Sequence, residues 1–501
     1  MFSLLAAMVM VSSGAGGRPQ GDGPGVGAVD AFAAFCWGWL VAGLANVAIG
    51  AMQVFAADWV DGNWIAHSGF PGRAVGNLRQ PNHLSSLLLW SCIATAVLLQ
   101  LGRLGRRWAC AVFAALVFTV VLTASRTGLV SVVLLAVWGA LDRRLSRPVR
   151  GLLIAAPLIY AAAWLGMAQW AALSAHSFGG TERLAETDIS SSRFAIWRDT
   201  LALIRQQPWT GVGFGEFNYA WTLTPSPHRP TALFDHTHNL PLQLAVELGL
   251  PLALLITVLF IIALVLAASR AWAAQGELGT AQRSALVMVL MIGLHSLLEY
   301  PLWYIYFLLP AAWAWGYALW PGDVKAGAAK PAGEDRPVAV ATAAPPSMVL
   351  GFANLAVVLV AAASVMDYAR VAAIFSADEG VAPLAQRIAV GQRSVFFAHH
   401  ADYAAVTSGV PVADPAHAFD RATHYLLDTR LMQAWAESLA AQGRVDQARY
   451  VAERLREFRK EDAAEFFAPC PVAAPDTGAS GVPFQCSLPV RTTAWRDLGA
   501  P

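Results

Sequence analysis

Three arginines lie in short polar segments that interrupt long apolar runs, and their side chains could bind a phosphate group. They are Arg79, Arg126 and Arg193. A guanidinium donates paired hydrogen bonds that match phosphate oxygens, and an arginine near hydrocarbon is costly unless it is paired. For Arg126, which follows Ser125 between two apolar runs, the structural alternative is a guanidinium that only snorkels from a helix end.

The segment 76–83, GNLRQPNH, brings amides, a cation and an imidazole together directly before an apolar run. Pro81 disfavours helical backbone at Gln80, so the segment is expected to turn at the membrane surface. The alternative interpretation is a helix cap, in which Asn82 or Ser85 binds free backbone amides.

Arg193 opens an expected amphipathic helix in the long loop 176–239. The expected apolar stripe consists of Phe194, Trp197, Leu201 and Ile204. Such a helix could lie flat on a membrane, and the amides of its first turn favour an anion. Gly211, Gly213 and Gly215 follow in an irregular turn that lacks the strand and the Gly-Lys-Ser/Thr of a nucleotide-binding loop.

Two histidines end this loop, in the sequence Asp235-His236-Thr237-His238-Asn239. A zinc site is not favoured there. Two histidines at i and i+2 would point to opposite sides of a helix, and the segment contains no cysteine. A histidine that acts as general base toward an acceptor hydroxyl fits better, since imidazole takes up a proton near neutral pH. The structural alternative is a polar helix cap.

The segment 295–304, HSLLEYPLWY, has His295 and Glu299 four residues apart. On one helix face this spacing permits a carboxylate to orient an imidazole. Tyr300 precedes Pro301 and is expected to be extended, within reach of a site. A structural pairing of the two side chains is the alternative.

The elements that must position these segments are membrane-spanning helices. Of the 501 residues, 56% are hydrophobic and 13% are charged, which exceeds what a soluble core can bury. The net charge of +1 gives no indication of a nucleic-acid partner. Runs of about 20 apolar residues cross a bilayer. The predicted spans lie near residues 31–57, 84–101, 108–124, 126–141, 151–175, 248–268, 284–298, 301–320 and 347–366.

Arginine-rich short loops stay on the cytoplasmic side, and two such loops fix the predicted orientation. They lie at 103–107 and 143–150. About nine spans threaded through these loops put residues 58–83, 176–239 and everything after 366 on the outer side. All five polar segments then share one face of the membrane, where they could form one site.

The predicted fold class is all-α: a polytopic transmembrane helical bundle with a large periplasmic loop and a small C-terminal helical periplasmic domain. In the tail, residues 434–458 have the spacing of a tetratricopeptide-like helical hairpin. Cys470 and Cys486 would suit one disulfide there, or remain two free thiols. The expected order of domains is an N-terminal segment 1–30 for which a truncated helix is one interpretation, a transmembrane domain 31–320, a cytoplasmic linker 321–346, a last span 347–366 and the domain 367–501.

The polar segments resemble, in order, the signatures of a known family. That family is the bacterial O-oligosaccharyltransferases of the PglL type, within the superfamily of O-antigen ligases and O-antigen polymerases. The similar segments are GNLRQPNHL, TASRTGLV, SSRFAIWRDTLALIRQQPWTGVGFGEF, HTHNLPLQLAVELGLP and HSLLEYPLWYIYFLLP. They span residues 76–310, and their joint order is more specific than any one of them. The tail resembles the periplasmic helical domain of such protein ligases.

The resemblance implies an enzyme of the bacterial inner membrane that needs no metal or other cofactor. It would transfer a glycan from undecaprenyl pyrophosphate to a Ser or Thr of a periplasmic or pilin protein. The resemblance maps pyrophosphate binding onto Arg79, Arg126 and Arg193, and catalysis onto His238, Tyr300 and Gln80. Candidates for a supporting role are His236, Asn239, His83 and Glu299.

Two alternatives to protein glycosylation remain. Within the same class, an O-antigen ligase acting on lipid A core, or a polymerase, would use the same donor. A membrane transporter is the alternative from a different class, and it would show inverted repeats with sites at the midplane of the membrane.

Overall fold

The structure is a computed structural model, and the chain divides into two compact units. It describes residues 9–10, 13, 26–174, 176–185, 192–227, 229–230, 233–320, 348–376, 382–411, 414–459, 461–470, 482–491 and 494–498. The first unit comprises residues 1–189 and 259–354, and the second comprises 190–258 and 355–501. The described residues form α-helices and short 3-10 helices without a β-strand, which confirms the all-α class.

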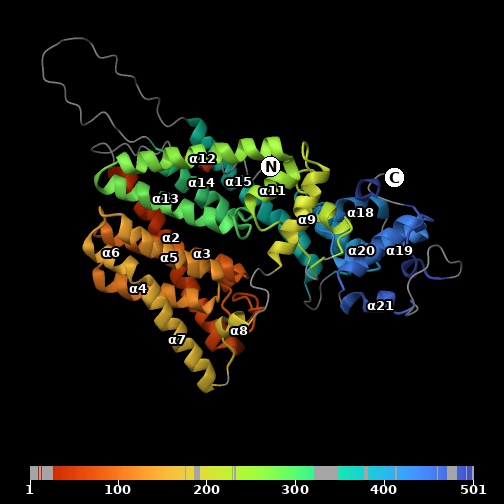
Figure 1. Ribbon diagram of the computed structural model, residues 1–501, viewed down its shortest axis with the longest axis horizontal. Helices are drawn as coiled ribbons and strands as arrows, with labels where there is room; N and C mark the ends of the chain where they lie inside the picture. The colour runs from red at the N-terminus through yellow and green to blue at the C-terminus, as the bar shows by residue number, and fades with distance from the viewer. Residues whose placement is uncertain are drawn as a thin grey trace, which may run out of the picture. The chain divides into compact units, whose positions relative to one another are not determined.

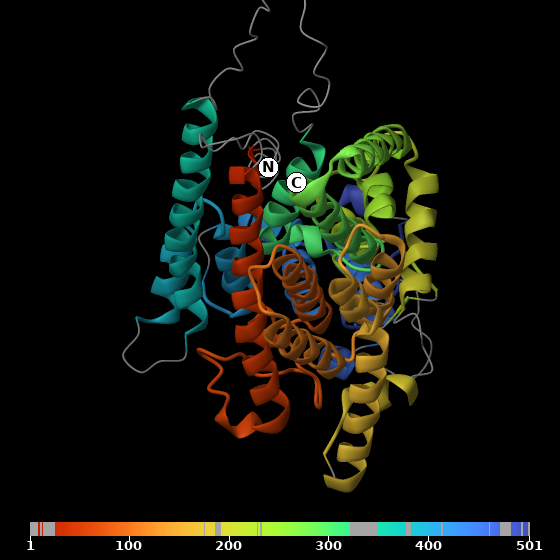
Figure 2. The ribbon, with the colours of Figure 1, turned by 90° about the vertical axis from the view of Figure 1, so that its left-hand side faces the viewer.

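A helix in the described part of the chain occupies each predicted span (Figure 1). The bounds are α2 Val26–Phe55, α3 Pro81–Gln100, α4 Arg106–Leu122, α5 Arg126–Leu141, α6 Arg147–Ile154, α7 Ala156–Ser174, α12 Leu250–Ala273, α13 Gly276–Ser296, α14 Ile305–Leu319 and α15 Met348–Ala372. Six segments are long and apolar enough to cross a bilayer: Gly27–Phe55, Pro81–Gln100, Arg147–Ser174, Leu250–Ala273, Gly276–Ser296 and Phe352–Phe375. The chain is therefore a multi-pass membrane protein. Figure 2 shows α2 as one long unbroken helix, with the following loop folded at its lower end.

Composition sorts these helices between the interior of the bundle and its surface. The most apolar window of α3 is 94% buried, whereas that of α12 is 11% buried. Ser86, Ser91 and Thr95 of α3 form hydrogen bonds within the bundle. Small and hydroxyl-bearing residues let helices approach closely, while an all-round Leu and Ile surface suits lipid. Helix α3 is thus the central element on which the first polar segment is mounted.

The second unit joins the long loop to the C-terminal tail. Its main helices are α9 Arg193–Gln206, α10 Phe217–Leu223, α11 Leu240–Leu248, α16 Leu384–Gly391, α17 Ala398–Thr407, α18 Pro415–Thr423, α19 Thr429–Ala441 and α20 Val445–Glu457. One hydrophobic core contains Phe217 and Trp221 of the loop together with Leu431 and Leu455 of the tail. Since each part buries apolar residues of the other, the loop and the tail fold together. The domain boundaries expected from the sequence stay a prediction.

The predicted helical hairpin at 434–458 corresponds to α19 and α20. The turn between them contains Gly443, whose φ of 77° is a left-handed conformation that glycine adopts without steric cost. Trp435 and Leu439 of α19 and Tyr450 of α20 are buried in the shared core.

A buried arginine, Arg229, is one of the points at which the loop is joined to the tail. Arg229 Nε donates to Glu457 Oε2 at 2.8 Å, and Nη1 donates to the carbonyl of Trp221 at 2.9 Å. The guanidinium carbon lies 4.8 Å from the ring centroids of both Trp221 and Phe458. A fully buried cation is tolerated because a carboxylate, carbonyls and two aromatic faces replace its water.

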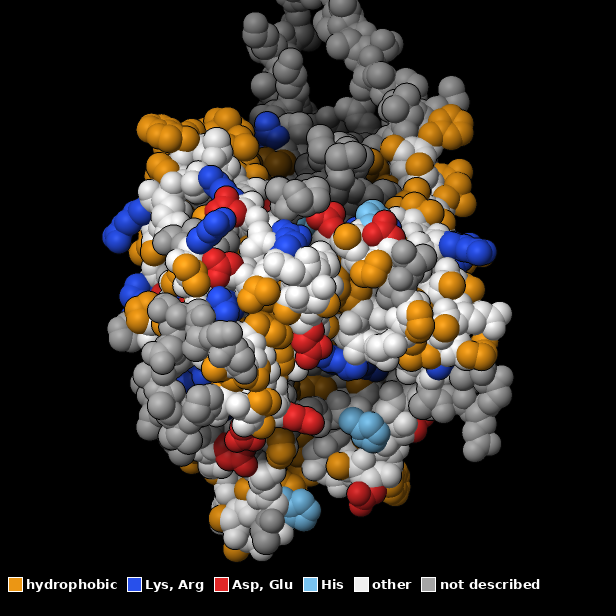
Figure 3. All heavy atoms as spheres, turned by 90° about the vertical axis from the view of Figure 1, so that its right-hand side faces the viewer, with side chains coloured by type: hydrophobic (Ala, Val, Ile, Leu, Met, Phe, Trp, Pro, Cys, Tyr) orange, Lys and Arg blue, Asp and Glu red, His pale blue; other side chains and the backbone are white. Residues whose placement is uncertain are grey.

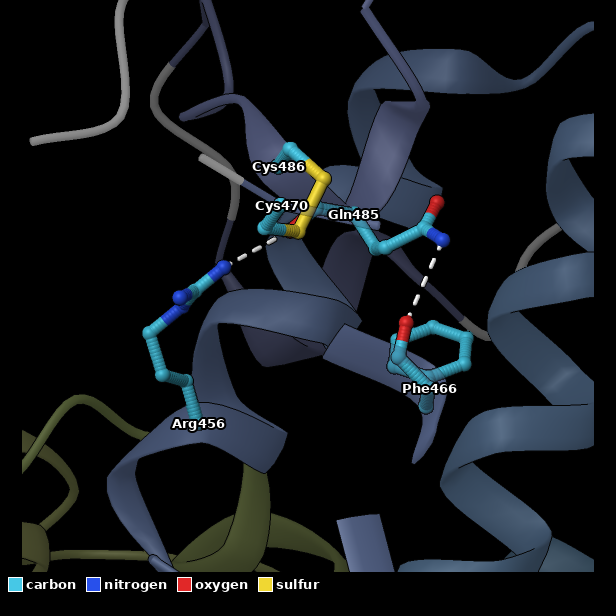
Figure 4. Close-up of a disulfide and its surroundings, with 5 residues drawn as sticks. All are labelled: Arg456, Phe466, Cys470, Gln485 and Cys486. Atoms are coloured by element: carbon cyan, nitrogen blue, oxygen red, sulfur yellow. Dashed lines mark hydrogen bonds between the residues drawn. A yellow bond between two sulfur atoms is a disulfide. The ribbon is translucent and has the colours of Figure 1, made fainter. Parts of the chain in front are cut away.

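Cys470 and Cys486 form a disulfide (Figure 4), so of the two alternatives left by the sequence the structure contains the bridge. Their Cα atoms are 5.1 Å apart. Arg456 Nη2 donates to the carbonyl of Gln485 at 2.9 Å, and Gln485 Nε2 donates to the carbonyl of Phe466 at 3.3 Å. The bridge and these two bonds hold the segment 482–491 against the preceding helices.

Helix α9 has a buried apolar face that differs from the stripe expected from the sequence, and the role of that stripe at a membrane stays a prediction. The structure buries Ile196, Leu203 and Ile204, whereas Phe194 is 69% exposed and Leu201 is 46% exposed. The buried face is set by packing against α10 and α11, which spacing within α9 alone does not reveal.

Candidate functional site

Asn82 connects three of the polar segments within the first unit. Its Nδ2 donates to Glu299 Oε1 at 2.9 Å, and its Oδ1 accepts from Ser125 Oγ at 2.7 Å. Ser85 Oγ lies 3.2 Å from Ser125 Oγ. All of these side chains are buried. One hydrogen-bonded network therefore fixes the positions of the segments around Gln80, Arg126 and Tyr300 relative to one another.

Gln80 caps α3, which corrects the alternative that assigned this cap to Asn82 or Ser85. Gln80 has extended backbone, as predicted for a residue before proline, and its Oε1 accepts from the backbone N–H of His83 at 2.8 Å. Arg79 is exposed and has a φ of 56°, so the chain turns sharply between the two predicted site residues.

Arg126 is the first residue of α5, and Ser125 caps that helix through a 3.0 Å hydrogen bond from the Gly128 N–H. Arg126 Nη2 donates to the carbonyl of Arg183 at 3.0 Å. A guanidinium beside the amides of a helix N-terminus is an arrangement that suits an anion. The role of Arg126 in phosphate binding stays a prediction.

Arg73 is a buried cation that was missed from the sequence. Its Nε donates to the carbonyl of Thr123 at 2.9 Å, two residues before the cap of α5. A Cβ on Gly179 would lie 2.1 Å from Arg73 Cγ, so a glycine is required for this close approach. The only signal in the sequence was an additional arginine in the outer loop that contains Arg79.

His83 lies among aromatic rings rather than at a surface. It is 1% exposed, its Nδ1 is 2.8 Å from Tyr306 Oη, and its ring centroid is 4.5 Å from that of Tyr304 and 6.4 Å from that of Tyr300. The first and the last polar segments therefore also meet through this group.

Helix α13 ends at Ser296, but the Glu299 N–H still donates to the His295 carbonyl at 2.8 Å, so the two residues remain one helical turn apart as expected. His295 Nδ1 lies 2.8 Å from Ser86 Oγ. Tyr300 was expected to have extended backbone. Its ψ is 49° instead, and it is the residue directly before the 3-10 helix Pro301–Trp303. The proline restricts the preceding residue, yet the short helix that follows determines its final conformation.

Residues 235–239 of the second unit, which we call the histidine loop, are held in place mainly by hydrogen bonds of the backbone. Thr237 is buried, its N–H donates to Gln243 Oε1 at 2.8 Å, and its carbonyl accepts from Trp197 Nε1 at 2.8 Å. Asn239 Oδ1 caps α11 by accepting from the Leu242 N–H at 3.0 Å. The cap alternative therefore holds for Asn239, whereas the two imidazoles on either side of Thr237 are not part of the cap.

His238 adopts a φ of 57°, a conformation that is uncommon for a residue with a side chain. Its Nδ1 is 3.0 Å from the carbonyl of His236, and its ring meets Phe234 edge to face at 5.4 Å. His236 Nδ1 is 2.9 Å from Asp235 Oδ1. Burial raises the pKa of Asp235, but the hydrogen bond and charge of His236, a backbone N–H and the charge of His238 together hold the pKa below its usual value.

The glycines of the segment 210–215 bring two backbones into contact. The Val212 N–H donates to the carbonyl of Val246 at 2.8 Å, and the Gly213 N–H donates to that of Glu247 at 3.1 Å. A Cβ on Gly211 would lie 2.4 Å from the Glu247 carbonyl, and one on Gly249 would lie 2.3 Å from that of Trp209. These glycines frame the end of α11 rather than cradle a nucleotide.

The predicted site residues thus fall into two groups. Arg79, Gln80, Arg126 and Tyr300 belong to the first unit with His83 and Glu299, whereas Arg193, His236, His238 and Asn239 belong to the second. Arg193 is the first residue of α9, as the sequence predicted. Among the residues that the structure describes, no three His, Cys, Asp or Glu side chains are grouped as a metal site would require.

Three known families match the chain in consecutive stretches. Residues 74–99 match the family described as protein glycosylation ligase, residues 111–257 match O-antigen ligase, and residues 283–468 match the C-terminal part of a virulence factor membrane-bound polymerase. The polar segments and the tail up to residue 468 fall within these matches. The chain belongs to the O-antigen ligase superfamily.

Within that superfamily the chain is of the PglL type, the group that contains O-oligosaccharyltransferases. It is 27% identical over 257 residues to the general O-oligosaccharyltransferase of Acinetobacter baylyi, which covers 49% of this chain and 43% of the relative. It is 28% identical over 260 residues to the ComP-specific O-oligosaccharyltransferase of the same organism, covering 50% of this chain and 44% of the relative. The matched region is thus less than half the length of these curated relatives.

Proposed function

We propose that this protein is an O-linked oligosaccharyltransferase of the bacterial inner membrane. It transfers a glycan from undecaprenyl pyrophosphate to a Ser or Thr of a periplasmic or pilin protein, on the periplasmic side. The observation that carries the proposal is the Asn82 network, which joins three of the family's five signatures at one buried point. The names of both relatives support protein as the acceptor.

Arginines would make the pyrophosphate a better leaving group. Arg79, Arg126 and Arg193 are the candidates, because a guanidinium spreads the charge that develops as the bond to the sugar breaks. The position of Arg126 at the N-terminus of α5 supports its role, since helix amides add to the same field. In this mechanism the arginines do the work of a divalent metal, so the reaction needs no metal ion.

His238 would act as the general base. Its Nδ1 lies 3.0 Å from the carbonyl of His236, a contact that favours a proton on Nδ1 and the lone pair on Nε2. Nε2 takes the proton of the acceptor hydroxyl while its oxygen bonds to the anomeric carbon, and undecaprenyl pyrophosphate leaves with the electrons of the broken bond. This direct displacement inverts the anomeric carbon.

The other candidates orient the reactants. Gln80 and Tyr300 would position the sugar or the acceptor hydroxyl, because both flank the Asn82 network and carry polar side chains. His83 and Glu299 support them from within the bundle, while His236 and Asn239 support His238 from the histidine loop.

Transfer to lipid A core is the second candidate function. The match of residues 111–257 to O-antigen ligase favours it, since that stretch contains Arg126, Arg193 and His238. A polymerase would use the same donor, and the match of residues 283–468 to a membrane-bound polymerase favours that activity.

Reconstitution distinguishes these candidates. Purified protein is mixed with undecaprenyl-pyrophosphate glycan and either a pilin protein or lipid A core, with excess EDTA in a parallel sample. Glycosylated pilin in both samples is the expected result. Product on lipid A core alone would make the protein a ligase, and loss of pilin product with EDTA would contradict the arginine mechanism.

A further inference from the structure

A cavity of about 290 Å³ lies within the second unit, between the loop and the tail helices. Its lining comes from α10, from α18 and the residue after it, from α19 and from the start of α20; these helices of the tail lie together in Figure 1. Ligand sites typically occupy about 300–1,000 Å³. This cavity is at the small end of that range, which suits one ring-sized unit of a larger ligand.

The floor of the cavity is aromatic. Tyr219 is 3% exposed, and Trp435 and Phe419 are each 7% exposed. The Tyr219 ring stacks on His424 with centroids 4.3 Å apart, and His424 Nδ1 is 2.8 Å from Glu216 Oε2. The tyrosine is therefore fixed in position by a hydrogen-bonded imidazole.

The Tyr219 hydroxyl is buried and has no hydrogen-bond partner among the described residues. A buried polar atom without a partner costs about 1–3 kcal/mol, so such a group in a cavity indicates a ligand that completes it. Burial and the nearby Glu216 and Asp420 carboxylates raise the pKa of Tyr219, which keeps the hydroxyl protonated as a donor.

The rim of the cavity is polar and contains both basic and acidic side chains. His417, Asp420 and Gln442 are exposed at the rim, and Arg444 also lines the cavity. The hydrogen bond to Glu216 raises the pKa of His424, and Arg444 adds a positive charge beside the Glu216 and Asp420 carboxylates. Basic and acidic side chains are also interspersed on the face of the molecule drawn in Figure 3.

We propose that this cavity binds one sugar unit of a glycan. The apolar face of a sugar ring packs on aromatic side chains, while planar amide, carboxylate and guanidinium groups bond its hydroxyls. Tyr219 and Trp435 supply the floor, and Asp420, Gln442 and Arg444 supply the polar groups. The inference rests on the proposed function for the source of the sugar, which is the donor glycan.

The test uses the full-length protein in detergent and saturation-transfer NMR. The probes are free glucose, galactose, N-acetylglucosamine and N-acetylgalactosamine at millimolar concentration. At least one is expected to bind, and Tyr219→Phe is expected to weaken its binding by about 3- to 10-fold, which corresponds to one net hydrogen bond. The matched control is Tyr450→Phe, which loses a hydroxyl that donates to the Leu223 carbonyl in the same core.

Three results would overturn the proposal: no saturation transfer from any probe, equal weakening in both tyrosine variants, or binding of a pilin peptide at the cavity when no sugar binds. His238→Asn separates the two hypotheses, because it is expected to lose transfer and retain sugar binding. Retained transfer in His238→Asn would contradict the proposed base without affecting the sugar assignment.

Discussion

The two units hold their candidate residues in different ways. In the first unit, side chains fix one another: Asn82 bonds to both Glu299 and Ser125, and Gln80 caps the helix on which Asn82 lies. In the second unit, the backbone of Thr237 is bonded on both sides, whereas His238 is a half-buried side chain beside that frame.

This difference predicts how the units respond to substitution. Removal of a side chain from the Asn82 network leaves a buried group without its partner, so folding and activity should fall together. Removal of an imidazole from the histidine loop leaves the backbone frame in place, so activity should fall alone. Four experiments can break or refine the comparison.

The largest expected effect is that of His238→Asn on transfer. Asparagine tolerates a positive φ and cannot act as a base, so the rate should fall by about 10²- to 10⁴-fold while thermal unfolding is unchanged. Transfer is measured with the reconstituted donor and pilin. His236→Asn is measured beside it and, because His236 only supports the base, should lose less activity than His238→Asn. A large loss of thermal stability in His238→Asn would contradict the proposal that the histidine loop, unlike the Asn82 network, keeps its structure when a side chain is removed.

Removal of the disulfide should destabilise the second unit alone. Cys470→Ser with Cys486→Ser opens a loop with a sequence separation of 16, for which chain entropy predicts about 3 kcal/mol. Hydrogen exchange is expected to increase in α19 and α20 and to stay constant in α3. Equal changes in both units would mean that they unfold as one.

Asn82→Ala should reduce the free energy of unfolding by about 1–3 kcal/mol and reduce transfer in parallel, because Glu299 and Ser125 lose a buried partner. Thermal unfolding and transfer are measured on the same preparations. Ser91→Ala is the control, since its hydroxyl bonds only backbone carbonyls. Normal stability with reduced transfer would instead make Asn82 a residue of the chemistry.

The smallest expected effect is on the acid stability of the tail. Burial, His400 and Arg421 lower the pKa of His399 from 6.5 to about 4. The stability that its neutral form contributes is present above pH 6.5 and is lost as the pH falls toward 4. His399→Gln should therefore show a smaller fall in melting temperature between these values, and an unchanged pH profile would contradict the assigned cause.

The membrane helices could be predicted from the sequence because their signal is local. Apolar length predicted a helix at each expected position, including α13 and α5, each of which carries a polar residue in or beside its run. The buried face of α9 could not be predicted, because Ile196 and Leu203 are buried by segments distant in the chain. Periodicity identifies a helix but does not select among its apolar faces when more than one exists.

The candidate residues could also be predicted, but not their partners. A motif names Gln80 and Arg126, yet the cap made by Gln80 depends on side-chain reach that spacing does not specify. Arg73 and Arg229 carried no motif, and both are explained only by carbonyls and rings brought to them by the fold. Long-range polar contacts are thus the part that sequence reasoning misses.

The shared core of the second unit has a consequence for biosynthesis. Arg229 and its partner Glu457 are 228 positions apart, so at about 5–20 residues per second the loop emerges roughly 10 to 45 seconds before the helix that covers it. During that interval Phe217 and Trp221 lack the tail side chains that bury them. The nascent chain must therefore pass through a period in which chaperones and proteases can recognise this loop.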